Sequence, residues 1–181
     1  MTRPAGPLAA LRADFRANAP GLGDRVTAAA LARHVPTVRF MAVALFRAAQ
    51  AAGARFGPAG SLLKQANHVL TGCDIAYQAT VGPGLVLYHP TGVVIGPGCR
   101  IGARATIMQG VTIGSDAVVA GPGAGSPAIG DDVFVGPGAA IFGALRIGDR
   151  VQVGANSVVG SSFESDVVIA GAPARVVRRG G

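Results

Sequence analysis

A six-residue repeat dominates the chain after residue 74. An aliphatic residue, most often followed by Gly, recurs at Ile75, Val81 and Leu87, at Ile95, Ile101, Ile107 and Ile113, and at Ile129, Val135, Ile141, Ile147, Val153 and Val159. A second small or apolar residue follows four positions later, at Ala79, Cys99, Ala105, Val111, Val133, Ala139, Val151 and Ser157. Neither an α-helix nor a flat sheet has a period of six, whereas a parallel β-helix has one. We therefore predict a solenoid of short strands, with three hexads in each coil.

Composition excludes several other classes of protein. Half of the residues are hydrophobic and 14% are charged, which is typical of an ordered chain. The 28 glycines show no G-X-Y period, so collagen is excluded. The net charge of +7 comes from residues 1–70, where nine Lys and Arg stand against Asp14 and Asp24. These arginines are spaced singly with little aromatic interleaving, so we interpret them as a solvated helical face and expect no nucleic-acid partner.

The cysteines and the N-terminus bear on the compartment. Cys73 and Cys99 occupy small-residue positions of the repeat, and we expect both to be buried free thiols. Free thiols fit a reducing, cytoplasmic setting. Arg12 and Asp14 interrupt the N-terminal apolar run, so we expect no signal peptide. No stretch approaches the roughly 20 apolar residues of a membrane helix, and we expect no membrane partner.

The chain divides into two predicted domains, a helical domain at 1–70 and a β-helix with a C-terminal tail at 71–181. Leu8, Leu11 and Phe15 form one helical stripe. A second helix is expected over 38–54, and a third after Gly60 with Ser61 as its N-cap. We expect the helices to close one end of the solenoid. The segment 115–128 breaks the repeat and is either a functional loop or a tolerated insertion. After Val159 the repeat dissolves into a short basic tail.

One of the three histidines lies inside the repeat. His34 and His68 fall in the helical region, where packing or surface roles are expected. His89 precedes a two-residue slip of the repeat, at a position where a small corner residue is normal. Histidine is the side chain best suited to proton transfer near neutral pH. Asp74 lies fifteen residues earlier, close to one coil, and could orient the imidazole of His89. Spacing alone leaves this dyad open.

The repeats, with Asp74-Ile75 and His89-Pro90-Thr91-Gly92 at this separation, resemble the hexapeptide-repeat acyltransferases, and most of all the serine O-acetyltransferases. The resemblance covers about residues 60–178. It implies a left-handed parallel β-helix that assembles as a homotrimer, either alone or as two joined trimers, with active sites between subunits.

The resemblance also implies a mechanism. His89, paired with Asp74, would take the proton from an acceptor hydroxyl, which then attacks the thioester of acetyl-CoA. Backbone N–H groups near Gly114 and Ser115 would stabilise the oxyanion. Acetyl-CoA would lie along small residues of the later coils, Gly136, Pro137, Gly154 and Ala155. No metal is implied.

Three acceptor-binding positions depart from the family's pattern. Tyr88 replaces an acid that helps to hold the amine of serine, and Gly125-Ser126 replace an Arg-His pair. Val35-Pro36 stand where the family has Asp-Pro. Sites built on specific polar groups discriminate strongly. We therefore expect free L-serine to be a poor acceptor unless residues such as Arg39 or Asp116 replace the lost contacts.

Several functions stay open at this point. Within the O-acetyltransferases, a serine-like acceptor at Tyr88 and Ser126 competes with the hydroxyl of a sugar or natural product. A non-catalytic trimeric scaffold is a different class. A metal hydratase of the carbonic anhydrase type needs about three His ligands on the coils, and this chain offers one there, so that class is disfavoured.

Overall fold

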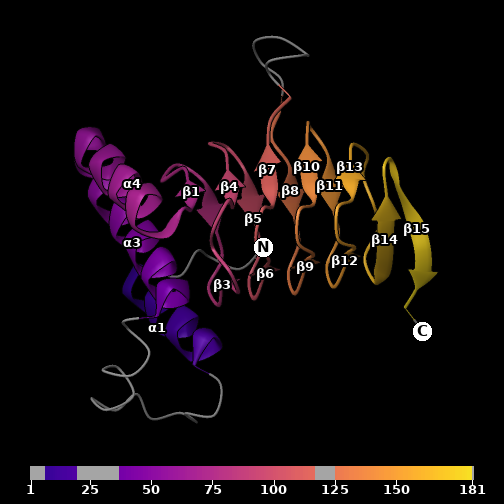
Figure 1. Ribbon diagram of the computed structural model, residues 1–181, viewed down its shortest axis with the longest axis horizontal. Coiled ribbons are helices and arrows are strands. Elements are labelled where there is room, and N and C mark those ends of the chain that lie inside the picture. Colours follow the sequence, from indigo (N-terminus) through magenta and orange to yellow (C-terminus); the bar gives the residue numbers. More distant parts are fainter. Residues whose placement is uncertain (1–6, 20–36, 117–124, 181) are drawn as a thin grey trace.

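A computed structural model describes residues 7–19, 37–116 and 125–180. Three helices, α1 (Pro7–Asn18), α3 (Val38–Gly53) and α4 (Gly57–Thr71), pack at one end of a stack of coils. The coils run from β1 to β13, and the hairpin of β14 and β15 lies at the far end, as Figure 1 shows.

The coils are built from very short strands. In chain order they are β1 (Asp74–Ile75), β2 (Thr80–Val81), β3 (Val86–Leu87), β4 (Val94–Ile95), β5 (Arg100–Ile101), β6 (Thr106–Ile107), β7 (Thr112–Gly114), β8 (Ala128–Ile129), β9 (Phe134–Val135), β10 (Ala140–Phe142), β11 (Arg146–Ile147), β12 (Gln152–Val153), β13 (Val158–Val159), β14 (Val167–Gly171) and β15 (Ala174–Arg179). Successive strands go to three sheets in turn. Sheet A has the order β1-β4-β7-β10-β13, sheet B β11-β8-β5-β2, and sheet C β15-β14-β12-β9-β6-β3. Up to β14 all pairings are parallel, so the predicted parallel β-helix is confirmed.

The hexad residues form the interior of this stack. In sheet A, for example, Ile75, Ile95, Ile113, Ile141 and Val159 lie in register on successive coils. Every hexad residue named above is buried, and so is every small residue four positions later. Each coil turns one residue of each strand inward, so the same aliphatic packing recurs at every level and the sequence repeats with it.

The helices close the first coil through side chains as well as through the core. Along the stack, N–H groups of one coil donate to carbonyls of the next, as from Thr80 to Cys99. The carbonyls of the first coil therefore have no earlier coil to bond. Gln50 Nε2 donates to Ala79 O at 2.8 Å, and Asn18 Nδ2 donates to Leu85 O at 2.8 Å. Polar side chains from α1 and α3 thus take the place of a preceding coil.

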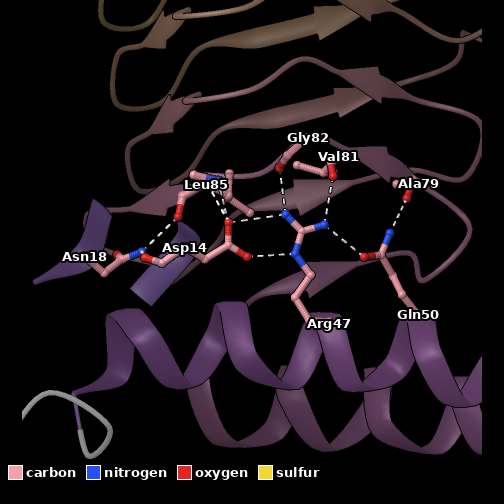
Figure 2. A network of polar contacts seen from close by, with 9 residues as sticks. Asp14, Asn18, Arg47, Gln50, Ala79, Val81, Gly82 and Leu85 are labelled. Carbon is pink, nitrogen blue, oxygen red and sulfur yellow. Dashed lines mark hydrogen bonds and ion pairs between the residues drawn. The ribbon is translucent and has the colours of Figure 1, made fainter. Parts of the chain in front are cut away.

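A buried ion pair lies at the centre of this contact (Figure 2). Arg47 Nε is 2.7 Å from Asp14 Oδ2, and the two side chains are 5% and 0% exposed. Arg47 also donates to Val81 O at 2.8 Å and to Gly82 O at 2.6 Å. Arg47 was among the arginines expected on a solvated face. That expectation is wrong for it, because its guanidinium satisfies buried carbonyls of the first coil.

Helices α3 and α4 approach each other closely where both carry Gly. A Cβ on Gly60 would lie 2.7 Å from the Cα of Gly53. Helix α3 matches the predicted helix to within one residue. Helix α4, however, begins at Gly57 with Phe56 as its N-cap, so the prediction of Ser61 as N-cap is wrong. Pro58 lies in the first turn, where its missing N–H costs nothing, and the helix therefore starts earlier than Ser61.

The C-terminal segment forms more structure than the dissolving repeat predicts. Phe163 makes a parallel bridge with Ile147, β14 extends sheet C, and β15 folds back antiparallel on β14. Five of the six residues of β15 are exposed, including Arg175, Arg178 and Arg179. No helix among the described residues is long and apolar enough to span a membrane.

The outer corners carry exposed ion pairs between successive coils. Arg104 Nε and Nη2 each donate to Asp132 at 2.6 Å. The two side chains are 58% and 39% exposed. Hydrogen bonding to Arg104 lowers the pKa of Asp132. The hydrogen bonds of this pair are shorter than those between Asp14 and Arg47, but both of its side chains are exposed to solvent.

Candidate active site

His89 lies at a bulged corner between sheet C and sheet A. Leu87 and Ile95, the hexad residues on either side, are eight positions apart, whereas Ile107 and Ile113 on the next coil are six apart. The chain leaves the ladder after Tyr88, whose N–H donates to Ile107 O at 3.1 Å. The two additional residues turn the side chain of His89 outward, where it is exposed.

Asp74 lies at the same corner, one coil earlier. It opens β1, and its N–H donates to Val93 O at 2.8 Å, while Gly92 N donates to Gly72 O at 2.8 Å. The structure thus brings Asp74 and His89 to one corner on successive coils. Among the described contacts the Asp74 carboxylate pairs with Lys64 Nζ at 2.7 Å and makes no hydrogen bond to the imidazole. Spacing within the repeat could not find Lys64, because it comes from α4.

Tyr88, the residue before His89, lies under the guanidinium of Arg39. The Cζ atom of Arg39 lies 4.1 Å from the centroid of the Tyr88 ring, and the Tyr88 and His89 ring centroids are 6.5 Å apart. Tyr88 is 43% exposed. Arg39, named above as a replacement contact for an acceptor, therefore lies beside the candidate base.

The residues expected to hold acetyl-CoA continue the edge on which His89 lies. The ladder runs from Tyr88 N to Ile107 O, from Met108 N to Val135 O, and from Gly136 N to Val153 O. Gly136 and Gly154 therefore occupy, on later coils, the corner position of Tyr88. Pro137 and Ala155 follow them at the position of His89. The structure brings these four residues to the same edge as the imidazole.

The glycines on this edge have a structural cause of their own. A Cβ on Gly136 would lie 2.8 Å from the backbone N of Ala155, and one on Gly154 would lie 2.9 Å from the Cβ of Ala170. Close stacking of coils thus requires both glycines with or without a ligand. Gly114 differs, because a Cβ there would meet no atom of the described residues within 4 Å. Within the described part of the chain, the space over Gly114 is open to an approaching group.

The remaining predicted site residues lie at the opposite corner, where the strands of sheet A end. Gly114 ends β7 and Ser115 follows it, whereas the His89 corner precedes sheet A. Ser126 Oγ donates to Pro97 O at 3.1 Å, at the same far corner. Asp116 lies there too, close to Gly143. Within one chain these residues do not meet His89. Val35 and His34 lie outside the described residues.

The thiols are unsuited to nucleophilic chemistry. Both cysteines are free and buried. Burial, with the nearby charge of Asp74, raises the pKa of Cys73 to about 12. Burial also raises the pKa of Cys99. In the part of the chain that the structure describes, no group of three His, Cys, Asp or Glu side chains could hold a metal ion.

A cavity of about 310 Å³ lies at the C-terminal end of sheet C, far along the stack from β3. Arg150, Asp166, Arg178 and Arg179 line part of it. It has no part in the His89 corner. The His89 corner itself combines an exposed imidazole with the guanidinium of Arg39 over the Tyr88 ring.

Comparison with known proteins bears on this chemistry. The family model "Bacterial transferase hexapeptide (six repeats)" matches residues 92–121, and "Hexapeptide repeat of succinyl-transferase" matches residues 144–171. The serine acetyltransferase of Staphylococcus xylosus is 40% identical over 120 residues, which are 66% of this chain and 55% of that protein. The chain thus spans about half the length of the curated relatives that it matches.

Solved structures agree with the sequence matches. Soybean serine acetyltransferase complexed with serine has a TM-score of 0.82 and 31% identity, covering 94% of this chain and 69% of that one. Serine acetyltransferase from Brucella abortus in complex with coenzyme A has a TM-score of 0.80 and 28% identity, covering 95% of this chain and 68% of that one.

Proposed function

We propose that this chain, which belongs to the hexapeptide-repeat acyltransferases and within them is most similar to the serine acetyltransferases, transfers an acetyl group from acetyl-CoA to the hydroxyl of a small acceptor. The observation that carries the proposal is the bulged corner. It exposes His89 on an edge that continues, beyond Met108 and Gln109 of the next coil, to the small residues Gly136, Pro137, Gly154 and Ala155.

In this mechanism the imidazole of His89 takes the hydroxyl proton of the acceptor. The hydroxyl oxygen forms a bond to the thioester carbonyl carbon, and the carbon–sulfur bond then breaks. The proton passes from His89 to the leaving thiolate, so that CoA leaves as the thiol. Asp74, which lies at the same corner and pairs with Lys64 at 2.7 Å, is proposed as the carboxylate that orients the imidazole. Backbone N–H groups near Gly114 and Ser115 stabilise the oxyanion.

The acceptor is proposed to be L-serine or a compound close to it. The named relatives are serine acetyltransferases, and two of the solved neighbours hold serine. These similarities favour a serine-like acceptor, contacted by Tyr88 and Ser126, over the hydroxyl of a sugar or natural product. They also favour catalysis over a scaffold without activity.

The complete site is proposed to need more than one chain. His89 and the pair Gly114–Ser115 lie at opposite corners of sheet A, and the outer face of that sheet exposes Val94 and Phe142. A closed homotrimer would join one protomer's His89 corner to the Gly114 corner of the next. We likewise propose that the β-helix is left-handed, as the resemblance to the hexapeptide-repeat acyltransferases implies. We propose a cytoplasmic location for the protein, which its free buried thiols support.

We also propose that the chain divides near residue 70 into a helical part and a β-helix part. The division is one of architecture, because Ala42, Val43 and Phe46 of α3 pack into the same core as Ile75 of the first coil.

The decisive experiment replaces the base. His89→Ala should lower the rate of acetyl transfer from acetyl-CoA to L-serine by roughly 10²–10⁴-fold, the range of a general base. Release of CoA thiol measures the rate, and calorimetry should show that CoA still binds. His68→Ala, on the exposed surface of α4, is the matched control and should keep the activity. Normal turnover by His89→Ala would exclude the mechanism.

A further inference from the structure

Two arginines of helix α3 differ in how their donors are used. Arg47 uses all five N–H donors of its guanidinium, on Asp14, Gln50 and two backbone carbonyls. Arg39 lies eight residues earlier. Its guanidinium makes no hydrogen bond and no ion pair with the described residues, and its Nε atom is buried without a partner. The same residue type is thus fully bonded at one position and unbonded at the other.

The position of Arg39 is nevertheless defined. Its guanidinium lies over the ring of Tyr88, with 4.1 Å from Cζ to the ring centroid, a cation–π contact. Stacking on one face of the guanidinium leaves the N–H groups along its edge able to donate in the plane. Because Tyr88 directly precedes His89, this contact holds a positive charge beside the candidate base.

Helix stability gives no reason for a cation at this position. Arg39 lies in the first turn of α3, which contains no acid. The N-terminus of a helix carries partial positive charge, so a cation there is unfavourable and an anion is favourable. An anionic group placed at Arg39 would gain from the guanidinium and from the helix terminus together. Among the described residues, therefore, neither a hydrogen-bond or ion-pair partner nor the helix itself accounts for the charge of Arg39.

We propose that Arg39, held by Tyr88, binds the carboxylate of the acceptor whose hydroxyl His89 deprotonates. This rests on the proposed function and specifies its substrate class, a small hydroxyl compound that carries a carboxylate. The planar guanidinium matches a carboxylate in geometry and charge. Free L-serine satisfies this requirement, whereas a neutral sugar leaves the guanidinium unpaired. Arg39 is therefore a specificity-determining residue that lies outside the repeat.

The test compares two acceptors that differ only at the carboxylate, L-serine and L-serinamide. The wild-type protein should prefer L-serine by about tenfold or more in kcat/KM. Arg39→Gln should raise KM for L-serine roughly 10- to 100-fold, as expected for one lost charge-assisted hydrogen bond, with kcat nearly unchanged. KM for L-serinamide should stay the same. Arg39→Lys keeps the charge without the planar group and should fall between the two.

Arg55→Gln is the matched control, because it removes an exposed arginine just beyond the other end of α3. It should leave both acceptors unaffected. If Arg39→Gln impairs L-serine and L-serinamide equally, Arg39 only supports Tyr88 and the inference is wrong. A changed oligomeric state of Arg39→Gln in light scattering would also overturn it.

If the wild-type protein acetylates neither compound, it is the proposed function that fails. Calorimetric titration of L-serine into the wild type and Arg39→Gln then decides about Arg39 alone. Binding that weakens at least tenfold in the variant supports the carboxylate site, and equal binding overturns it.

Discussion

The buried ion pair between α1 and α3 allows a quantitative test of how the helices hold the first coil. We consider Asp14→Asn. The Asp14 carboxylate, which is fully buried, accepts Arg47 Nε at 2.7 Å, Arg47 Nη2 at 3.3 Å, Gly84 N at 2.7 Å and Leu85 N at 2.8 Å. The amide of Asn removes the charge and turns a donor toward these donors. Arg47 then stays buried without a counter-ion.

Removing one partner of a buried pair costs about 3–5 kcal/mol. We expect that loss in the free energy of unfolding, against a total of roughly 5–15 kcal/mol for a typical domain. Replacing Arg47 together with Asp14 should not restore stability, because Arg47 also serves the carbonyls of Val81 and Gly82. Buried groups left unsatisfied cost about 1–3 kcal/mol each.

The assay is denaturant unfolding at one fixed protein concentration, since self-association shifts apparent stability. Asp132→Asn is the control. Its bonds to Arg104 are shorter, 2.6 Å, but the pair is exposed, and such pairs contribute about 1 kcal/mol or less. Equal losses for Asp14→Asn and Asp132→Asn would refute the reasoning, because burial would then not decide the effect.

Three further predictions concern packing, thiols and assembly. Gly60→Ala should lower the free energy of unfolding by roughly 1–3 kcal/mol, because its Cβ would meet Gly53, whereas Gly57→Ala, whose Cβ lies 3.4 Å from the hydroxyl of Tyr77, should cost less in the same thermal melt. Because burial raises the pKa of Cys73 from 9.0 to about 12, the native state holds the thiol proton more tightly than the unfolded chain does. The resulting contribution to the free energy of unfolding is fully present below pH 9.0 and is lost as the pH rises towards about 12. Over that pH range the free energy of unfolding should therefore fall less in Cys73→Ala than in the wild-type protein. At pH 8 a thiol reagent should label the thiols of the native protein only as the protein unfolds. Light scattering should give three times 17.9 kDa, and a stable monomer at micromolar concentration would contradict the shared site.

The repeat predicts the β-helix well because every coil packs the same kind of aliphatic side chain at the same positions in the interior. The inward residues, from Ile75 to Val159, and the small residues between them are buried as the pattern requires. His89 is predictable from the sequence because it departs from this pattern. The hairpin of β14 and β15 is not predictable from it, because its residues follow no hexad.

The contacts between the helices and the coils could not be predicted from the repeat, for a different reason. Arg47, Lys64 and Arg39 each join α3 or α4 to segments far along the chain, and no period relates the partners. Composition suggested only that such charges face water. Their partners depend on how the helices dock, which is a matter of tertiary packing. The separation of the candidate site residues into two corners likewise depends on the three-sheet arrangement, in which the His89 corner precedes sheet A and Gly114 ends one of its strands.

The two ends of the stack have a consequence for solubility. A parallel β-helix is a template for its own extension, because each coil offers the next a matching row of backbone groups. At one end Arg47, Gln50 and Asn18 already occupy the carbonyls that an incoming coil would need. At the other end the chain reverses direction in β15, an edge strand that carries Arg175, Arg178 and Arg179. Charged edges of this kind resist strand addition. End-to-end growth into fibres is thereby blocked at both ends, and self-association is left to the sides of the stack.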